Sequence, residues 1–195
     1  MMATEGPFLA AVIARLADPT VNLAAYGVAF AFAILIESPV IMLMSASTAL
    51  VNNAQTYRKL RKFMHVMNAT ATGFLVIVLI PPVYNWLAVG LLGLPKEVTQ
   101  LTYGALWILL PWPSAIGYRR FLHGLLIRAG RTRLLAYGTI FRLSAMCLTA
   151  TTLYSLMDLP GAWIGAASLS LGVAAEAVVA RIMATSTIRE LDAKI

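Results

Sequence analysis

The chain has 195 residues, of which 60% are hydrophobic and only 12% charged, and its mean hydropathy is +0.80. A soluble domain of this length needs far more polar surface, so the composition excludes an ordinary soluble fold. The formal net charge of +7 does not call for a nucleic-acid partner, because the basic residues cluster in alternate loops, as the positive-inside rule predicts for a membrane protein.

The apolar runs predict an all-α, polytopic membrane helical bundle, with residues 1–195 forming a single membrane domain. Several runs reach the length of about 20 residues that a bilayer core requires. Alternating short strands, typical of a transmembrane β-barrel, are absent from the sequence. We expect a truncated first helix and five full transmembrane helices, at about 8–16, 21–51, 63–92, 98–118, 134–156 and 162–183.

Proline residues mark the breaks and bends that we expect in these helices, since proline removes a backbone donor. Pro81 and Pro82 interrupt the run that begins at residue 63. Pro39 lies within the long second run, and Pro111 and Pro113 lie within the fourth. These last three prolines are candidate hinges for alternating access, and static kinks are the alternative.

Basic loops predict the orientation of the bundle. The loop at 58–62 carries four basic residues, the segment 119–133 carries five, and Arg181, Arg189 and Lys194 lie near the C-terminus. The other loops carry mainly acids, at Asp18, Glu97 and Asp158. We therefore expect a multi-pass protein of the inner (cell) membrane whose C-terminus is cytoplasmic. The leading segment lacks the basic start of a signal peptide and resembles the end of a helix whose beginning is missing.

Two ionisable residues lie inside the last two apolar runs at matching depths. Arg142 lies eight residues from the start of its run, and Glu176 lies about eight residues from the end of the next. Both are then about 12 Å from the same membrane face. A charge at the bilayer centre costs roughly 2.5–3.5 kcal/mol and is rarely carried without a partner or a use. We expect an intramembrane ion pair, either structural or part of gating and coupling.

Glu37 is a second acid inside an apolar run. Helical periodicity places Tyr26, Glu37 and Thr48 on one stripe, and Pro39 leaves the Leu35 carbonyl without its usual partner. A carboxylate beside freed backbone is typical of a proton or cation site, so this stripe is a candidate cavity lining. The alternative is a polar residue that faces the bundle at a kink.

The basic residues of the segment 119–133 admit three interpretations. Arg119, Arg120 and Arg131 are candidates for binding lipid head groups or an anionic substrate. Membrane topology alone also demands such charges.

Catalytic and metal chemistry are not expected. The two histidines, His65 and His123, are far apart in sequence, and the single cysteine, Cys147, lies in an apolar run and so excludes an internal disulfide. No serine–histidine or paired-aspartate arrangement converges, so we expect neither an enzyme nor a cofactor, although H⁺ or Na⁺ remains a candidate coupling ion.

Several motifs resemble one transporter superfamily. This superfamily is that of the multidrug/oligosaccharidyl-lipid/polysaccharide flippases. The region from its fourth to its fifth helix is similar to Leu110-Pro111-Trp112-Pro113, Arg119-Arg120-Phe121-Leu122-His123-Gly124, Arg128 to Arg133 and Arg142. The best likeness is to the progressive ankylosis protein group and to bacterial relatives known as multi antimicrobial extrusion (MATE) proteins. The sixth helix of that group is similar to Gly161-Ala162-Trp163-Ile164-Gly165-Ala166 through Ala175-Glu176. The second helix of the group is similar to Leu23-Ala24-Ala25-Tyr26-Gly27 and Glu37-Ser38-Pro39.

The resemblance implies two six-helix lobes around a central cavity with alternating access. MATE members expel organic cations in exchange for protons or sodium, whereas the ankylosis group is linked to export of anions such as pyrophosphate, ATP and citrate. This chain has one lobe and only part of a first helix, so we expect either a fragment or a half that pairs with a second copy or second lobe.

These observations predict a half-size MATE-like secondary transporter that exports a small molecule by ion-coupled alternating access. Its expected partners are membrane lipid and a small-molecule substrate, without nucleic acid. The alternative function is a non-transporting membrane scaffold or accessory subunit, which needs only helix packing and basic loops.

Overall fold

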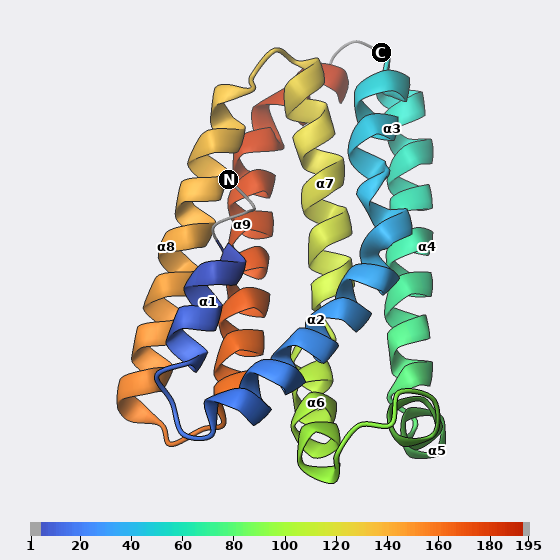
Figure 1. The fold of residues 1–195 in the computed structure, drawn as a ribbon. Helices are drawn as coiled ribbons and strands as arrows, with labels where there is room; N and C mark the ends of the chain where they lie inside the picture. The colour runs from blue at the N-terminus through green and yellow to red at the C-terminus, as the bar shows by residue number, and fades with distance from the viewer. Residues whose placement is uncertain (1–4, 193–195) are drawn as a thin grey trace.

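The computed structural model describes residues 5–192, and every regular element in that range is a helix (Figure 1). The first half of the chain contains α1 Glu5–Ile13, α2 Pro19–Ile41, α3 Leu43–Leu50, α4 Ala54–Val78 and α5 Pro81–Asn85. The second half contains the π-helix η2 Trp86–Leu91, α6 Lys96–Ile108, α7 Trp112–Arg128, α8 Arg133–Leu156 and α9 Gly161–Asp192.

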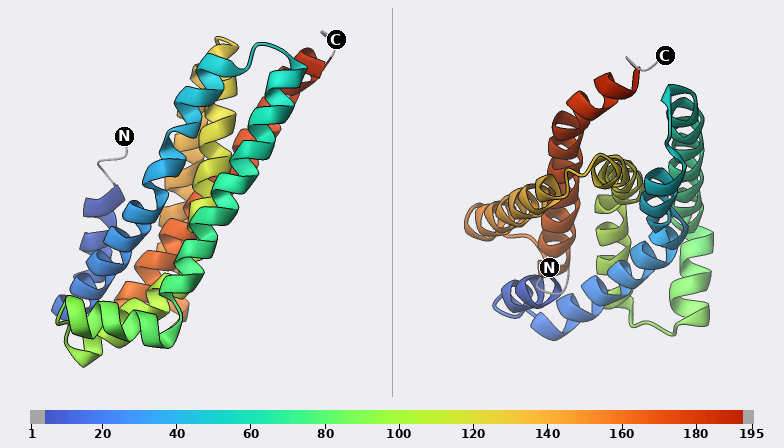
Figure 2. Two further views of the ribbon diagram at one scale, coloured as in Figure 1. Left: turned by 90° about the vertical axis from the view of Figure 1, so that its right-hand side faces the viewer. Right: turned by 90° about the horizontal axis from the view of Figure 1, so that it is seen from above.

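Helix α7 lies between two helix pairs, α8–α9 on one side and α3–α4 on the other (Figures 1 and 2). Helix α2 crosses the bundle diagonally, and α6 continues the direction of α7 towards the opposite end. The α3–α4 and α7–α8 connections and the end of α9 all lie at the upper end in Figure 1. The basic residues 58–62 at the start of α4, Arg128, Arg131 and Arg133 around the α7–α8 connection and Arg189 near the end of α9 therefore share one end of the bundle. Arg119 and Arg120 lie inside the bundle, and Lys194 lies outside the described residues.

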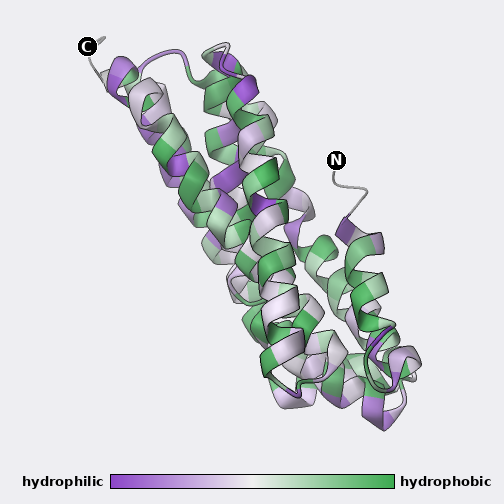
Figure 3. Ribbon diagram, turned by 90° about the vertical axis from the view of Figure 1, so that its left-hand side faces the viewer, coloured by the Kyte–Doolittle hydropathy of each residue, from purple (hydrophilic) through white to green (hydrophobic). Residues whose placement is uncertain are grey.

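Three helical segments in the described part of the chain are long and apolar enough to cross a membrane, which supports a membrane protein. They are Pro19–Leu50, made of α2 and α3, then α8, and α9 over Gly161–Leu191. A fourth span exists if α4 is taken together with α5 and η2, which are bent from it by 73°. Large apolar side chains such as Phe74, Phe141 and Leu148 are exposed on α4 and α8, where they suit lipid. Hydrophobic positions recur along the length of the long helices (Figure 3).

The segment 98–118, which we expected to be one bent span, is two helices. Helix α6 ends at Ile108 and α7 begins at Trp112, because Pro111 and Pro113 withhold backbone donors at the junction. Neither helix alone has the length of about 20 residues that a bilayer core requires. Helix α7 then continues to Arg128, so the prediction of a basic loop from residue 119 is wrong for its first ten residues.

Two other helices differ in length from the prediction. Helix α4 begins at Ala54 rather than 63, because Asn53 and Thr56 form a reciprocal cap in which the Thr56 N–H donates to Asn53 Oδ1 over 2.9 Å. Helix α9 continues to Asp192, so the segment after Met183 is helical, not a polar tail, as far as the structure describes it.

Helices α3 and α7 approach each other most closely at Gly124. A Cβ atom at this position would collide with the Ser47 hydroxyl and the Met44 carbonyl of α3. About two turns earlier, Gly117 similarly faces Asn68 of α4 and Val40 of α2. The two glycines let α7 sit against three helices at once, and this packing orients its polar face towards α8 and α9.

Candidate functional site

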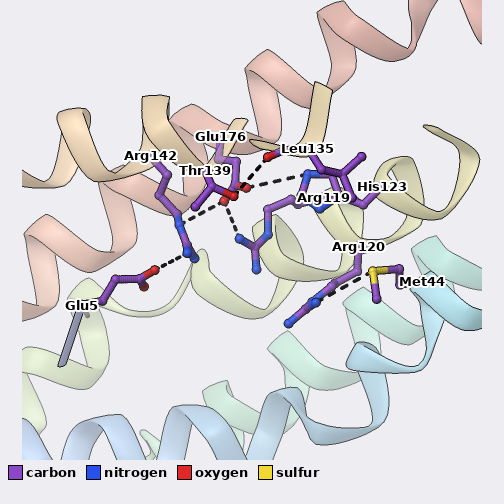
Figure 4. A network of polar contacts seen from close by, with 9 residues as sticks. All are labelled: Glu5, Met44, Arg119, Arg120, His123, Leu135, Thr139, Arg142 and Glu176. Atoms are coloured by element: carbon purple, nitrogen blue, oxygen red, sulfur yellow. Dashed lines mark hydrogen bonds and ion pairs between the residues drawn. The ribbon is translucent and has the colours of Figure 1, made fainter. Parts of the chain in front are cut away.

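Glu176 of α9 is the centre of a buried polar network, and its side chain is fully excluded from solvent. The Arg119 Nη1 of α7 donates to Glu176 Oε2. The Arg142 Nε of α8 lies 3.2 Å from the same oxygen. The pair that we predicted between Arg142 and Glu176 is therefore present, but one carboxylate faces two guanidinium groups (Figure 4).

The network extends to two further side chains, one on α1 and one on α7. Arg142 also donates through Nη2 to Glu5 in the first turn of α1. On the other side, His123 Nε2 of α7 lies 3.7 Å from Glu176 Oε1. Charged groups from α1, α7, α8 and α9 thus meet inside the bundle (Figure 4).

Local sequence explains why these side chains can meet. Arg119 and His123 are four residues apart on α7, so they lie on one face and both point towards α9. On α9, Gly172 lies one turn before Glu176. A Cβ there would stand 3.3 Å from the Arg142 carbonyl, so glycine allows α8 and α9 to approach closely enough for the ion pair.

Glu37 has a partner of its own on α7. Trp112 Nε1 donates to Glu37 Oε2 over 2.5 Å. Tyr26 stacks on Phe30 with ring centroids 5.9 Å apart, and Phe30 meets the edge of Trp112 at 6.5 Å. Tyr26 and Glu37 therefore face the same side of α2, as the helical periodicity predicted.

Thr48 lies on α3, beyond the end of α2 at Ile41, and does not line the cavity that the Glu37 side chain faces, so its predicted role there stays a prediction. Its hydroxyl donates to the Met44 carbonyl over 2.8 Å and lies 3.3 Å from the Gly124 carbonyl of α7. The kink at Pro39 is stabilised because the Ser38 hydroxyl donates to the Leu35 carbonyl over 2.9 Å.

A cavity of about 330 Å³ lies between α1, α2, α7, α8 and α9. Its polar lining consists of two carboxylates and three guanidinium groups, and aromatic and aliphatic side chains complete it. The charged lining residues are Glu5, Glu37, Arg119, Arg120 and Arg142. The cavity therefore joins the Glu37 face to the network around Glu176.

Arg119 offers hydrogen bonds that the described chain does not use. Its residue is only 2% exposed, and it lines the cavity. Within residues 5–192, no side chain or backbone group accepts from Arg119 Nε or Nη2, both of which are buried. A buried donor without a partner costs free energy, so these nitrogens are suited to an acceptor inside the cavity.

The burial of Arg119 corrects one prediction. A side chain inside the bundle cannot bind lipid head groups, so that role is wrong for Arg119, whereas the anion role stays a prediction. Arg120 lies beside it on α7, and its Nη1 is 3.9 Å from Met44 Sδ.

Arg131 has protein partners at the basic end of the bundle. It donates to Thr187 over 3.1 Å and to Glu190 over 2.7 Å, and also to Ser186. These contacts attach the α7–α8 connection to the end of α9. A role in binding lipid head groups or anions stays a prediction for this residue.

Sequence reasoning missed three members of the site: Glu5, Trp112 and His123. The signal for the last two was helical periodicity, because Trp112, Arg119 and His123 recur at spacings of seven and four residues and so share one face of α7. Glu5 carried no such signal, since it precedes the first apolar residues and reads as part of a polar leader. Among the described residues, no group of three His, Cys, Asp or Glu side chains is placed to hold a metal ion.

Comparison with models of protein families, with curated proteins and with solved structures finds no match to this chain. The resemblance to the flippase superfamily therefore stays a prediction. The chemistry of the cavity is the basis on which a function can be argued.

Proposed function

We propose that this chain is a membrane transport protein, one lobe of a MATE-like secondary transporter, which moves a small anion through its charged cavity. The observation that carries the proposal is the cavity of about 330 Å³, which places three arginines and two glutamates inside an otherwise apolar bundle. Ionisable residues at such depth are costly and mark substrate or ion pathways in membrane proteins.

The polar lining favours an anion over a cation. Three guanidinium groups and two carboxylates line the cavity, and Glu176, which contacts Arg119 and Arg142, balances the third guanidinium. The preference for an anion rests on Arg119, whose Nε and Nη2 are buried donors without an acceptor in the described chain and suit a carboxylate or phosphate oxygen. The volume lies at the small end of the range of about 300–1,000 Å³ for ligand sites, which favours a compact substrate.

Glu37 is the group that we propose for ion coupling, by H⁺ or Na⁺. It lines the same cavity as the three arginines, and its hydrogen bond from Trp112 ties it to the start of α7. Pro39 and Pro113 lie close to this contact in sequence, so we propose that the α2–α3 and α6–α7 junctions are the hinges of alternating access.

The complete transporter is proposed to need a second lobe or a second copy of the chain. Five spans then cross the inner membrane in each lobe, with α6 and α7 together forming one of them. The positive-inside rule supports a cytoplasmic location for the end that carries Arg131 and the end of α9.

Replacing Glu37 by glutamine should separate coupling from substrate movement. In proteoliposomes that contain a pH-sensitive dye, inward movement of citrate by the wild-type chain should change the internal pH. In Glu37→Gln this pH change should be smaller by about tenfold or more, because a glutamine side chain cannot take up and release the proton that the carboxylate carries. Exchange of radiolabelled citrate for internal citrate should continue, since no net proton movement is needed.

The matched control is Glu190→Gln, which removes a carboxylate from the exposed contact with Arg131 and should alter neither reading. An unchanged pH response in Glu37→Gln contradicts the coupling role. If the wild-type chain exchanges neither citrate nor phosphate, transport of these anions is contradicted, and the accessory-subunit function is favoured instead.

A further inference from the structure

Glu5 differs from the other carboxylates of the site in how it is held. It lies in the first turn of α1, a helix of nine residues that packs against α2, α8 and α9. Its side chain lines the cavity and accepts a hydrogen bond from Arg142. Glu176, by contrast, is fully buried on the long helix α9 and faces two arginines. Glu5 can therefore leave its arginine with less rearrangement than Glu176.

The Glu5 carboxylate contacts Arg142 in the same way that an anionic ligand would contact it. A guanidinium fork presents the same donors to a protein carboxylate as to a free carboxylate or phosphate. Arg119, on the same cavity wall, has two donors without acceptors in the described chain. A ligand that bridged Arg119 and Arg142 would need the space and the donor that Glu5 now uses.

Charge balance also opposes the binding of an anion while the Glu5 carboxylate stays in the cavity. Three arginines, Arg119, Arg120 and Arg142, meet three glutamates at this depth, namely Glu5, Glu37 and Glu176. An added anion would leave an uncompensated negative charge in a medium of low dielectric, which is strongly unfavourable. Departure of the Glu5 carboxylate removes one negative charge and so reduces this cost.

We propose that Glu5 is an internal competitor that occupies the anion position on Arg142, and that an anionic substrate binds by displacing it and releasing the first turn of α1. The inference rests on the proposed function, because it takes the cavity to be the substrate site. It implies that the position of α1 depends on whether the cavity holds an anion.

The first test is anion binding by the purified full chain in detergent, with citrate and inorganic phosphate as probes at constant ionic strength. Glu5→Gln should bind citrate about tenfold more tightly than the wild type, the change expected when one charged hydrogen bond no longer competes. Arg119→Gln should lose binding, and Glu190→Gln should match the wild type.

The second test follows α1 without altering Glu5. Cys147 on α8 is exposed and is the single cysteine of the chain, so Ala11→Cys on the exposed side of α1 creates one defined pair of labelling sites. With nitroxide labels on both sites, citrate should lengthen or broaden the distance distribution between α1 and α8. The same labels in the Glu5→Gln background should give a distribution that is already broad and that citrate does not change.

The outcomes separate the two proposals. If the wild type binds citrate, Glu5→Gln binds it no more tightly and the label distance stays constant, the competitor role is overturned while the cavity remains an anion site. If neither protein binds citrate or phosphate, the anion transport function fails, and this inference fails with it. A change in label distance with Glu5 intact supports the inference even where Glu5→Gln does not fold.

Discussion

Replacing Glu176 by glutamine is expected to destabilise the bundle by about 3–5 kcal/mol, the cost of removing one partner from a buried ion pair. The side chain keeps its shape but loses its charge. Arg119 and Arg142, which are 2% and 3% exposed, would then lose the carboxylate of α9 that both contact. Of these two, only Arg142 would keep a carboxylate contact, through Glu5.

Thermal unfolding in a mild detergent measures this effect, with Glu190→Gln as the matched control. Glu190 pairs with Arg131 at 2.7 Å, but its side chain is 57% exposed, so its loss should cost less than about 1 kcal/mol. The double variant Glu176→Gln/Arg142→Gln should recover part of the stability. Equal, small losses for Glu176→Gln and Glu190→Gln would show that the buried network does not hold the helices together.

Replacing Gly124 by alanine is expected to destabilise the protein by about 1–3 kcal/mol or more, through overpacking. The added methyl group would meet the Ser47 hydroxyl and the Met44 carbonyl of α3. A side chain can rotate away, but a backbone carbonyl cannot. Relief therefore requires α3 and α7 to separate along their closest contact.

Gly27→Ala is the control for this prediction, because a Cβ at Gly27 on α2 meets nothing within 4 Å. There the exchange should be neutral or stabilise the helix by up to about 1 kcal/mol, since alanine is the better helix former. The same unfolding assay compares the two variants. A Gly124→Ala protein as stable as Gly27→Ala would contradict the close approach of α3 and α7.

Helix α8 illustrates what sequence reasoning predicts well. Its expected limits, 134–156, differ by one residue from the observed Arg133–Leu156, because the mainly apolar run has a basic start and contains no proline or glycine pair that would end the helix early. The contact of Arg142 with Glu176 followed from depth alone. Both results depend on short-range periodicity and on the length that a bilayer imposes.

Arg119 illustrates where such reasoning fails. Counting basic residues as loop markers assigns every arginine near a span end to the membrane surface, and it ignores which face of a helix the residue occupies. Continuation of α7 to Arg128 turns Arg119 towards α9 instead.

Glu5 could not be assigned from its own neighbourhood, because its partner lies 137 residues later in the chain. No local pattern reports a contact of that range. The same holds for Glu37 and Trp112, which are 75 residues apart.

These long separations have a consequence for biosynthesis. Glu5 and Glu37 leave the ribosome before any of the three arginines that later surround them, since Arg119 is the first of these in the chain. At roughly 5–20 residues per second, Glu5 waits about 7–27 s for Arg142 to be made. During that interval its carboxylate has no cationic partner from this network, so α1 can take up its final place only after α8 has been synthesised.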